Sequence, residues 1–167
     1  MEQIQDFIDQ VHAARQAARR GIQVADTADL ERVARLAAYL ARDLAEICTI
    51  AGLKTGQFQV LAELRGRDPL PMSASDLARA IVLTTGGLTP VLDQLEERGL
   101  INRQMDPDDR RARRITITEK GRSLIIRAAE QWTMRQRALN AVLTVEERES
   151  LNAILRKLLA TIETKSS

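Results

Sequence analysis

The sequence predicts a mainly α-helical protein that carries one small β-hairpin. The chain has 167 residues, of which 44% are hydrophobic and 29% charged, as in globular domains that bury a core. Aromatic residues make up only 2%, while Ala, Leu and Arg, which favour helices, are abundant. Apolar residues recur at every third or fourth position along most of the chain. This spacing gives way to alternation near residues 100–118, where we expect the hairpin.

Seven helices are predicted from the apolar spacing and from residues that favour helix ends. They lie at about 3–20, 27–52, 55–65, 73–81, 85–98, 118–140 and 144–162. Ser73 with Asp76, and Thr144 with Glu147, have the spacing of capping pairs at helix starts. The segment 67–71 contains two prolines and is therefore predicted to be a loop.

The hairpin is predicted after Gly99, which is suited to end the preceding helix. Residues 100–104 and 114–118 form its two strands, and the charged segment between them forms an exposed tip. The window 98–122 holds eight basic and four acidic residues, so its net charge is +4, whereas the whole chain carries +2. A local excess of arginine of this kind is typical of phosphate binding.

A short helix, a tight turn, an amphipathic helix and a basic hairpin, in this order, indicate a winged helix-turn-helix. Its second helix is expected in the DNA major groove and its hairpin tip in the minor groove. The residues that we assign to the major-groove contact are Thr84, Thr85, Gly86, Gly87, Thr89, Pro90 and Gln94. The two glycines let the backbone approach phosphates, and the helix start adds N–H donors. Pro90 removes one helical hydrogen bond and its ring presses on the carbonyl of Gly86, so we expect an irregular helix start.

Four motifs at fixed spacing carry a resemblance to a known family. They are Thr84-Thr85-Gly86-Gly87-Leu88-Thr89, the run Leu92-Asp93-Gln94-Leu95-Glu96-Glu97-Arg98-Gly99-Leu100-Ile101, Asp106-Pro107-Asp108-Asp109-Arg110-Arg111 and Ile117-Thr118-Glu119-Lys120-Gly121. With them the chain resembles the MarR family of bacterial regulators, most closely over about residues 55–125. The resemblance implies a homodimeric transcriptional repressor that binds a pseudo-palindromic double-stranded DNA operator and is released by a small-molecule effector.

The resemblance also implies roles for particular residues. In the wing, Asp109 would orient Arg111 for the minor groove, and we place Arg110 and Arg113 beside them. The terminal helices would form the dimer interface, where we assign Leu151, Ile154, Leu155, Leu158, Leu159 and Ile162. The expected organisation is N-terminal helices for dimerisation and linkage at 1–54, a DNA-binding lobe at 55–118 and C-terminal dimerisation helices at 119–167.

The effector cannot be named from the sequence. The N-terminal helix and the start of the recognition helix resemble the urate-responsive branch of the family, whose ligand residues do not carry over. The ligand residues of that branch include a Trp in an early helix, whereas the only Trp of this chain is Trp132. The branch also uses an Asp and an Arg for its ligand, and the corresponding positions here are Gln59 and Val91. We place a candidate effector pocket at His12, Tyr39, Gln59 and Val91, between the dimer helices and the DNA-binding lobe.

Two other functions remain open alongside this one. A winged-helix module for protein–protein interaction would be expected to lack wing arginines, and this wing has four between residues 110 and 114. A redox-sensing regulator would use Cys48, but the end of its helix and its apolar neighbours disfavour a thiolate.

Enzymatic activity is not expected. The sequence has no phosphate-binding loop, no cysteine cluster for a metal and one histidine, so no cofactor or metal is assigned. The N-terminus lacks a signal peptide, and no run approaches the ~18 apolar residues of a membrane span. We therefore expect a cytoplasmic protein.

Overall fold

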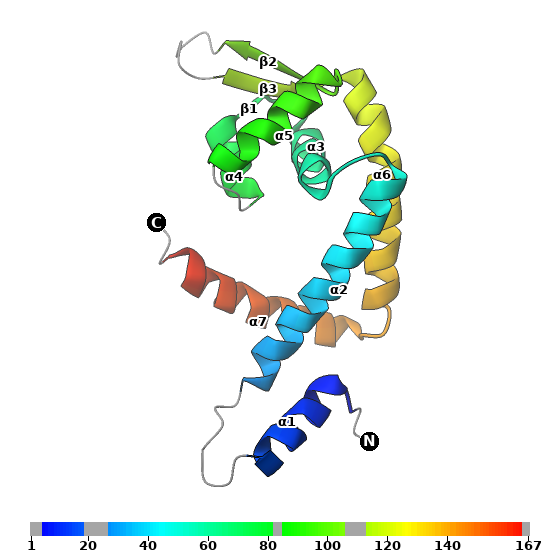
Figure 1. Ribbon diagram of the computed structural model, residues 1–167, viewed down its shortest axis with the longest axis vertical. Coiled ribbons are helices and arrows are strands. Elements are labelled where there is room, and N and C mark those ends of the chain that lie inside the picture. The colour runs from blue at the N-terminus through cyan, green and yellow to red at the C-terminus, as the bar shows by residue number, and fades with distance from the viewer. Residues whose placement is uncertain (1–4, 19–26, 82–84, 106–112, 165–167) are drawn as a thin grey trace.

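The computed structural model describes residues 5–18, 27–81, 85–105 and 113–164 (Figure 1). The helices and strands in these ranges are α1 (Phe7–Ala18), α2 (Ala28–Ile50), α3 (Thr55–Arg67), β1 (Met72–Ser73), α4 (Ala74–Ala80), α5 (Thr85–Glu97), β2 (Ile101–Met105), β3 (Arg113–Ile117), α6 (Glu119–Asn140) and α7 (Val145–Glu163). This order confirms the prediction of a mainly α-helical winged helix-turn-helix with flanking helices.

The long helices α2 and α6 lie side by side and join two parts of the molecule (Figure 1). At one end, α3, α4 and α5 pack with the small sheet into a compact lobe. At the other end, α1 packs on α2, and α7 lies across the same helix. The helix α1 begins at Phe7, later than predicted, because the Asp6 carboxylate accepts hydrogen bonds from the N–H groups of Ile8 and Asp9 and caps the helix there.

The core lies in the lobe, and it fixes the position of α5. Its largest fully buried side chains come from α3, α4, α5, the sheet, α6 and the end of α2. On α5 the buried residues are Leu88, Leu92 and Leu95, spaced three or four apart. One face of α5 is therefore held against the lobe, and the opposite face is left in solvent.

The sheet has three strands, whereas the sequence predicted two. The additional strand β1 pairs with β3, with Met72 opposite Ile115 and Ser73 opposite Arg114, so the strand order is β1-β3-β2. A strand of two residues is too short to show the alternation of polar and apolar residues that predicts a strand. It forms because Met72 is buried and the proline-containing loop before it returns the chain to β3. The wing strand β3 is thus bonded on both sides.

The helix α5 is continuous from Thr85 to Glu97 with Pro90 inside it. The expected irregular start is therefore not found within these residues. Pro90 and Gly86 are both exposed, and no heavy atom lies within 4 Å of where a Gly86 Cβ would stand. Water can reach the Gly86 carbonyl that loses its helical partner, which limits the effect of the proline.

Candidate DNA-binding surface

The helices α4 and α5 form the helix-turn-helix. Ser73 caps α4, because its Oγ accepts a hydrogen bond from the Asp76 backbone N–H at 3.1 Å, which confirms the predicted capping pair. Leu77 and Ala78 are buried, and α4 packs against α5. This support holds α5 along the lobe, beside α4 (Figure 1).

The N-terminal half of α5 presents the predicted major-groove residues to solvent. Gly86, Gly87, Thr89 and Pro90 are all exposed, and the first turn contains no acidic residue. Thr84 lies outside the described residues, as does the side chain of Thr85. The first backbone N–H groups of a helix lack helical acceptors and carry a partial positive charge. An acid-free, exposed helix start is suited to approach phosphates.

The C-terminal half of α5 carries acids, and an arginine of the wing pairs with two of them. Arg103 of β2 forms an ion pair with Asp93, and its Nε lies 2.9 Å from Oε2 of Glu96. The Arg103 side chain is only 18% exposed. It ties the wing to α5 and cancels negative charge that would repel DNA. No role was predicted for Arg103, although it lies two residues after buried Ile101 and so on the same face of the strand.

Gln94, a predicted base contact, takes part in a polar network inside the lobe. Its Oε1 accepts hydrogen bonds from Lys54 Nζ and from Gln57 Nε2, each at 3.2 Å. Gln57 itself is only 3% exposed. Its Oε1 accepts hydrogen bonds from the Lys54 backbone N–H and from the Arg98 guanidinium, each at 3.0 Å. These bonds fasten the start of α3 to the end of α5. Sequence periodicity could not predict them, because they join residues about 40 positions apart.

The wing is described only at its base. Arg113 is exposed at the start of β3, opposite Met105 of β2. The predicted minor-groove residues Asp109, Arg110 and Arg111 lie outside the described residues.

The predicted effector residues occupy four different helices. His12 Nε2 lies 3.3 Å from a Glu31 carboxylate oxygen, between α1 and α2. Tyr39 is exposed on α2, and its hydroxyl accepts a hydrogen bond from Arg35 at 3.1 Å. Val91 of α5 packs beside Gly56 of α3.

Gln59 is the member of this set that lines a hollow of about 480 Å³, between α2, α3, α4 and α6. Phe58 and Trp132 are among its other walls, but His12, Tyr39 and Val91 are not. The structure therefore does not gather the four predicted residues around this hollow.

The predicted dimer residues lie on a helix that buries no side chain. On α7, Leu151, Ile154, Leu158, Leu159 and Ile162 are exposed and Leu155 is half-buried. Four of the six line an apolar hollow of about 280 Å³ together with α2, and its walls include Leu30, Val33, Leu36, Leu151, Ile154, Leu155 and Leu158. Contiguous exposed apolar surface of this kind marks an interaction site.

Cys48 is buried at the end of α2. Burial raises the pKa of its thiol above the ordinary value, and a hydrogen bond with Thr55 opposes that shift. This environment is typical of a packing residue and disfavours the thiolate that a redox sensor needs.

The described residues have neither a candidate metal site nor a candidate membrane span. They bring together no group of three His, Cys, Asp or Glu side chains that could hold a metal ion. Among the described helices, none combines the length and apolar character needed to cross a lipid bilayer.

Comparison with known proteins places these features in a family. The model of the MarR family matches residues 53–112. The HTH-type transcriptional regulator PecS of Dickeya dadantii (strain 3937) is 31% identical over 124 residues, which cover 74% of this chain and 75% of PecS.

Solved structures share the fold. A MarR-family transcriptional regulator from Silicibacter pomeroyi is similar with a TM-score of 0.73 and 25% identity, over 84% of this chain and 97% of the other. MepR of S. aureus, solved in a complex with DNA, has a TM-score of 0.75 and 20% identity, over 83% of this chain and 99% of MepR. The sequence match to PecS, the family match over the helix-turn-helix and wing, and the shared fold together show that this chain belongs to the MarR family of transcriptional regulators.

Proposed function

We propose that this protein is a homodimeric transcriptional regulator that binds double-stranded DNA with sequence specificity. The observation that carries the proposal is the division of α5 into two halves. The N-terminal half is exposed and free of acids, while two acids of the other half are paired with Arg103. MepR, a protein of the same fold, was solved in a complex with DNA, which supports DNA binding by this chain.

In the proposed complex, the start of α5 enters the major groove. Thr84, Thr85 and Thr89 provide hydroxyl groups for base edges, and Gly86 and Gly87 allow the backbone to approach phosphates. Gln94 has a supporting role, because a contact with a base would require it to leave Lys54 and Gln57.

The wing would follow the adjacent minor groove. Arg110, Arg111 and Arg113 would provide positive charge there, and Asp109 would orient Arg111. The central place of β3 in the sheet supports this function, because it holds the base of the wing at a fixed position beside α5.

The homodimer would form through α7 and α2. Their exposed leucines, isoleucines and valines would leave water when a second copy covers them, and this burial would drive association. Two lobes related by a twofold axis would then read a pseudo-palindromic operator, with half-site centres about 10 bp apart.

A small-molecule effector would release the DNA. The hollow of about 480 Å³ beside Gln59 has the size of a ligand pocket and lies between the long helices and the lobe. A ligand that binds better to one separation of the two lobes shifts the population toward that separation. In this proposal the protein represses transcription in the cytoplasm, and we assign it no catalytic step.

Fluorescence anisotropy tests the DNA-binding proposal. The labelled DNA is the region upstream of the protein's own gene, with a scrambled duplex for comparison, at roughly 50 and 200 mM salt. We expect tight binding to the first duplex that weakens as salt rises. Arg113→Ala and Arg111→Ala should each lower the salt slope by about one unit, because each removes a phosphate or minor-groove contact.

The matched control is Arg137→Ala, which removes an exposed arginine of α6 away from the lobe. It should leave both affinity and slope unchanged. Absence of salt-dependent binding by the wild-type protein would contradict the proposal and favour an interaction module. Equal slopes for the wild type and both wing variants would contradict the wing assignment.

A further inference from the structure

Among the residues that the structure describes, Gln57 is the one polar residue that is buried. It lies in the first turn of α3, shortly after the junction that joins α2 to α3. A buried amide without partners costs free energy, whereas a fully hydrogen-bonded one fixes the geometry of the groups around it. The partners of Gln57 therefore show which parts of the lobe this side chain holds together.

The Gln57 amide joins the start of α3 to α5. Its Oε1 accepts hydrogen bonds from the Lys54 N–H and from Arg98, and its Nε2 donates to Gln94 in the second half of α5. Arg98 follows the last residue of α5, and its carbonyl accepts a hydrogen bond from Lys120 Nζ of α6 at 2.8 Å. The end of α5 is thus bonded to the start of α3 on one side and to the start of α6 on the other.

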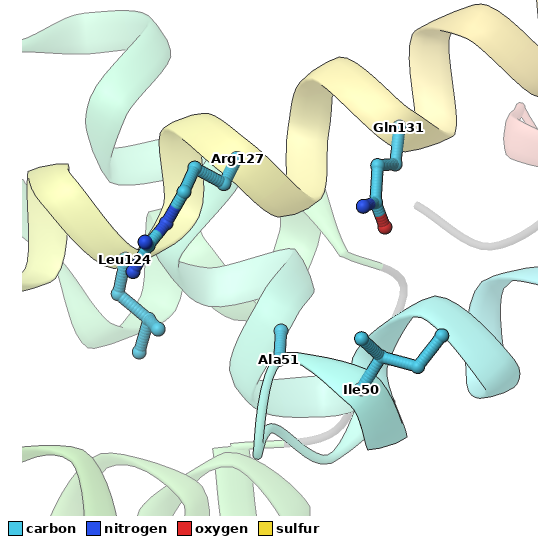
Figure 2. A pocket seen from close by; sticks show the side chains of 5 residues that line it. All are labelled: Ile50, Ala51, Leu124, Arg127 and Gln131. Atoms are coloured by element: carbon cyan, nitrogen blue, oxygen red, sulfur yellow. The ribbon is translucent and has the colours of Figure 1, made fainter.

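Packing alone holds the junction between α2 and α3 only on part of its surface. A hollow of about 320 Å³ lies between the end of α2 and α6, and its walls are Ile50, Ala51, Leu124, Arg127 and Gln131 (Figure 2). A second hollow of about 440 Å³ lies on the side of α5 and has Gln57 in its wall. Side chains that border a hollow lose packing contacts there. The hydrogen bonds of Gln57 therefore contribute directly to holding this junction against α5.

A small tilt of α5 at this link displaces the proposed DNA-binding end of the helix. Gly86 precedes Gln94 by eight residues, which is about 12 Å along a helix that rises 1.5 Å per residue. A tilt of about 5° at Gln94 therefore moves Gly86 by about 1 Å. A hydrogen bond to a base edge is lost when it lengthens by this amount, whereas attraction between charges and phosphates decreases only slowly with distance. The tilt of α5 thus affects sequence-specific binding more than non-specific binding.

We propose that Gln57 is a positioning residue for α5. Its three hydrogen bonds fix the tilt of α5 against α3, and this tilt determines how strongly the protein prefers its operator over other DNA. Gln57 is buried and acts only through α5, without touching the DNA. The proposal rests on the proposed function, because it concerns the selectivity of DNA binding.

Anisotropy titrations of full-length variants with the upstream duplex and the scrambled duplex test the proposal. The readout is the ratio of the two affinities, in which effects common to both duplexes cancel. Gln57→Leu removes the three hydrogen bonds at similar volume and unchanged charge. It should lower the ratio about tenfold, which corresponds to one or two net hydrogen bonds. Affinity for the scrambled duplex and its salt slope should stay unchanged, because both depend on charge.

Two further variants separate hydrogen bonding from packing. Gln57→Glu keeps an acceptor for Lys54 and Arg98, and the Gln94 amide can turn to donate to the second oxygen. Its ratio should stay within about threefold of the wild type. Arg98→Met removes one of the three bonds while Gln57 stays in place, so its ratio should be intermediate.

The matched control is Gln131→Leu, the same change at an exposed position of α6 (Figure 2). It should leave the ratio unchanged. Thermal unfolding establishes that each variant is folded at the temperature of the titrations. If Gln57→Leu is not folded there, Arg98→Met tests the proposal, and a wild-type ratio for this variant overturns it.

Three outcomes for folded Gln57→Leu would each overturn the positioning role. The first is a ratio equal to that of the wild type. The second is an equal loss of affinity for both duplexes, which a purely structural defect would produce. The third is a ratio as low in Gln57→Glu as in Gln57→Leu, because the hydrogen bonds would then not be the cause.

Hydrogen exchange in the free protein distinguishes failure of this proposal from failure of the proposed function. In Gln57→Leu, the amides of residues 91–97 in α5 should exchange at least about threefold faster than in the wild type, while those of residues 130–140 in α6 should not change. Unchanged exchange in α5 would overturn the positioning role even if the wild type binds its operator. If the wild type binds neither duplex, the proposed function fails, and faster exchange in α5 would then show that the link between α3 and α5 exists without a role in DNA selectivity.

Discussion

Gly121 stands where α6 begins against the end of α5, and its replacement by alanine should destabilise the fold. A Cβ at this position would lie 2.2 Å from the Leu100 carbonyl oxygen and 2.9 Å from Cγ1 of Ile117. The Leu100 oxygen already accepts a hydrogen bond from the Thr118 N–H at 3.1 Å. To reach even 3.0 Å from the new methyl group, that carbonyl must move by 0.8 Å, the difference between 3.0 and 2.2 Å.

The expected magnitude follows from two opposing effects. Overpacking in a core costs about 1–3 kcal/mol, and the upper part of this range applies because backbone must move. Alanine gains about 1 kcal/mol over glycine from helix propensity. Gly121→Ala should therefore lower the free energy of unfolding by about 2 kcal/mol, which lowers the Tm by roughly 4–8 °C in a domain of this size.

Thermal and urea unfolding, followed by circular dichroism at one fixed protein concentration, measure the effect. The control is Gly66→Ala near the end of α3, where no heavy atom lies within 4 Å of the added Cβ. The control should be neutral or stabilising by up to about 1 kcal/mol. If Gly121→Ala were as stable as the control, the packing of α6 on Leu100 would be described wrongly.

Three further outcomes are expected. Arg103→Gln should weaken DNA binding about tenfold at low salt, because it restores the negative charges of Asp93 and Glu96, and salt should shrink the difference; equal anisotropy titrations for variant and wild type would contradict this. The Arg122 guanidinium lowers the pKa of the Asp68 carboxyl in the folded protein, so this pair stabilises the fold above the unfolded carboxyl pKa, and that contribution is lost as the pH falls through the lower folded value. Asp68→Asn should therefore reduce stability at neutral pH and approach wild-type stability as the pH falls below the lowered pKa of the Asp68 carboxyl, and a difference in urea midpoint that does not change with pH would refute the linkage. The buried Cys48 thiol, with its raised pKa, should react with an aromatic disulfide reagent only slowly in the native protein and fast in urea, so that rapid native reaction at neutral pH would speak against a packing role.

The helices could be predicted from the sequence because their signals are local. Apolar residues three or four apart placed all seven helices, and two glycines marked helix ends that the structure confirms. Gly52 and Gly99 follow α2 and α5 with φ of 65° and 66°, a region that side chains with a Cβ rarely adopt. The strand β1 could not be predicted, because its two residues pair with β3 about 40 positions later.

The candidate DNA-binding surface could be predicted only in part. The exposed face of α5 followed from the spacing of Leu88, Leu92 and Leu95, since a helix that buries one face exposes the other. The roles of Gln94 and Arg103 depend on which side chains meet across different elements, and neither periodicity nor composition contains that information.

The lack of buried side chains on α7 has a consequence for how such a regulator responds to its own abundance. If a second copy supplies the cover for α7, the burial of this helix and dimer assembly become one event, which depends on the number of molecules in the cell. Occupancy of the operator then rises more steeply than in proportion to copy number, because each active unit requires two chains. A gene controlled in this way would switch over a narrow range of regulator synthesis.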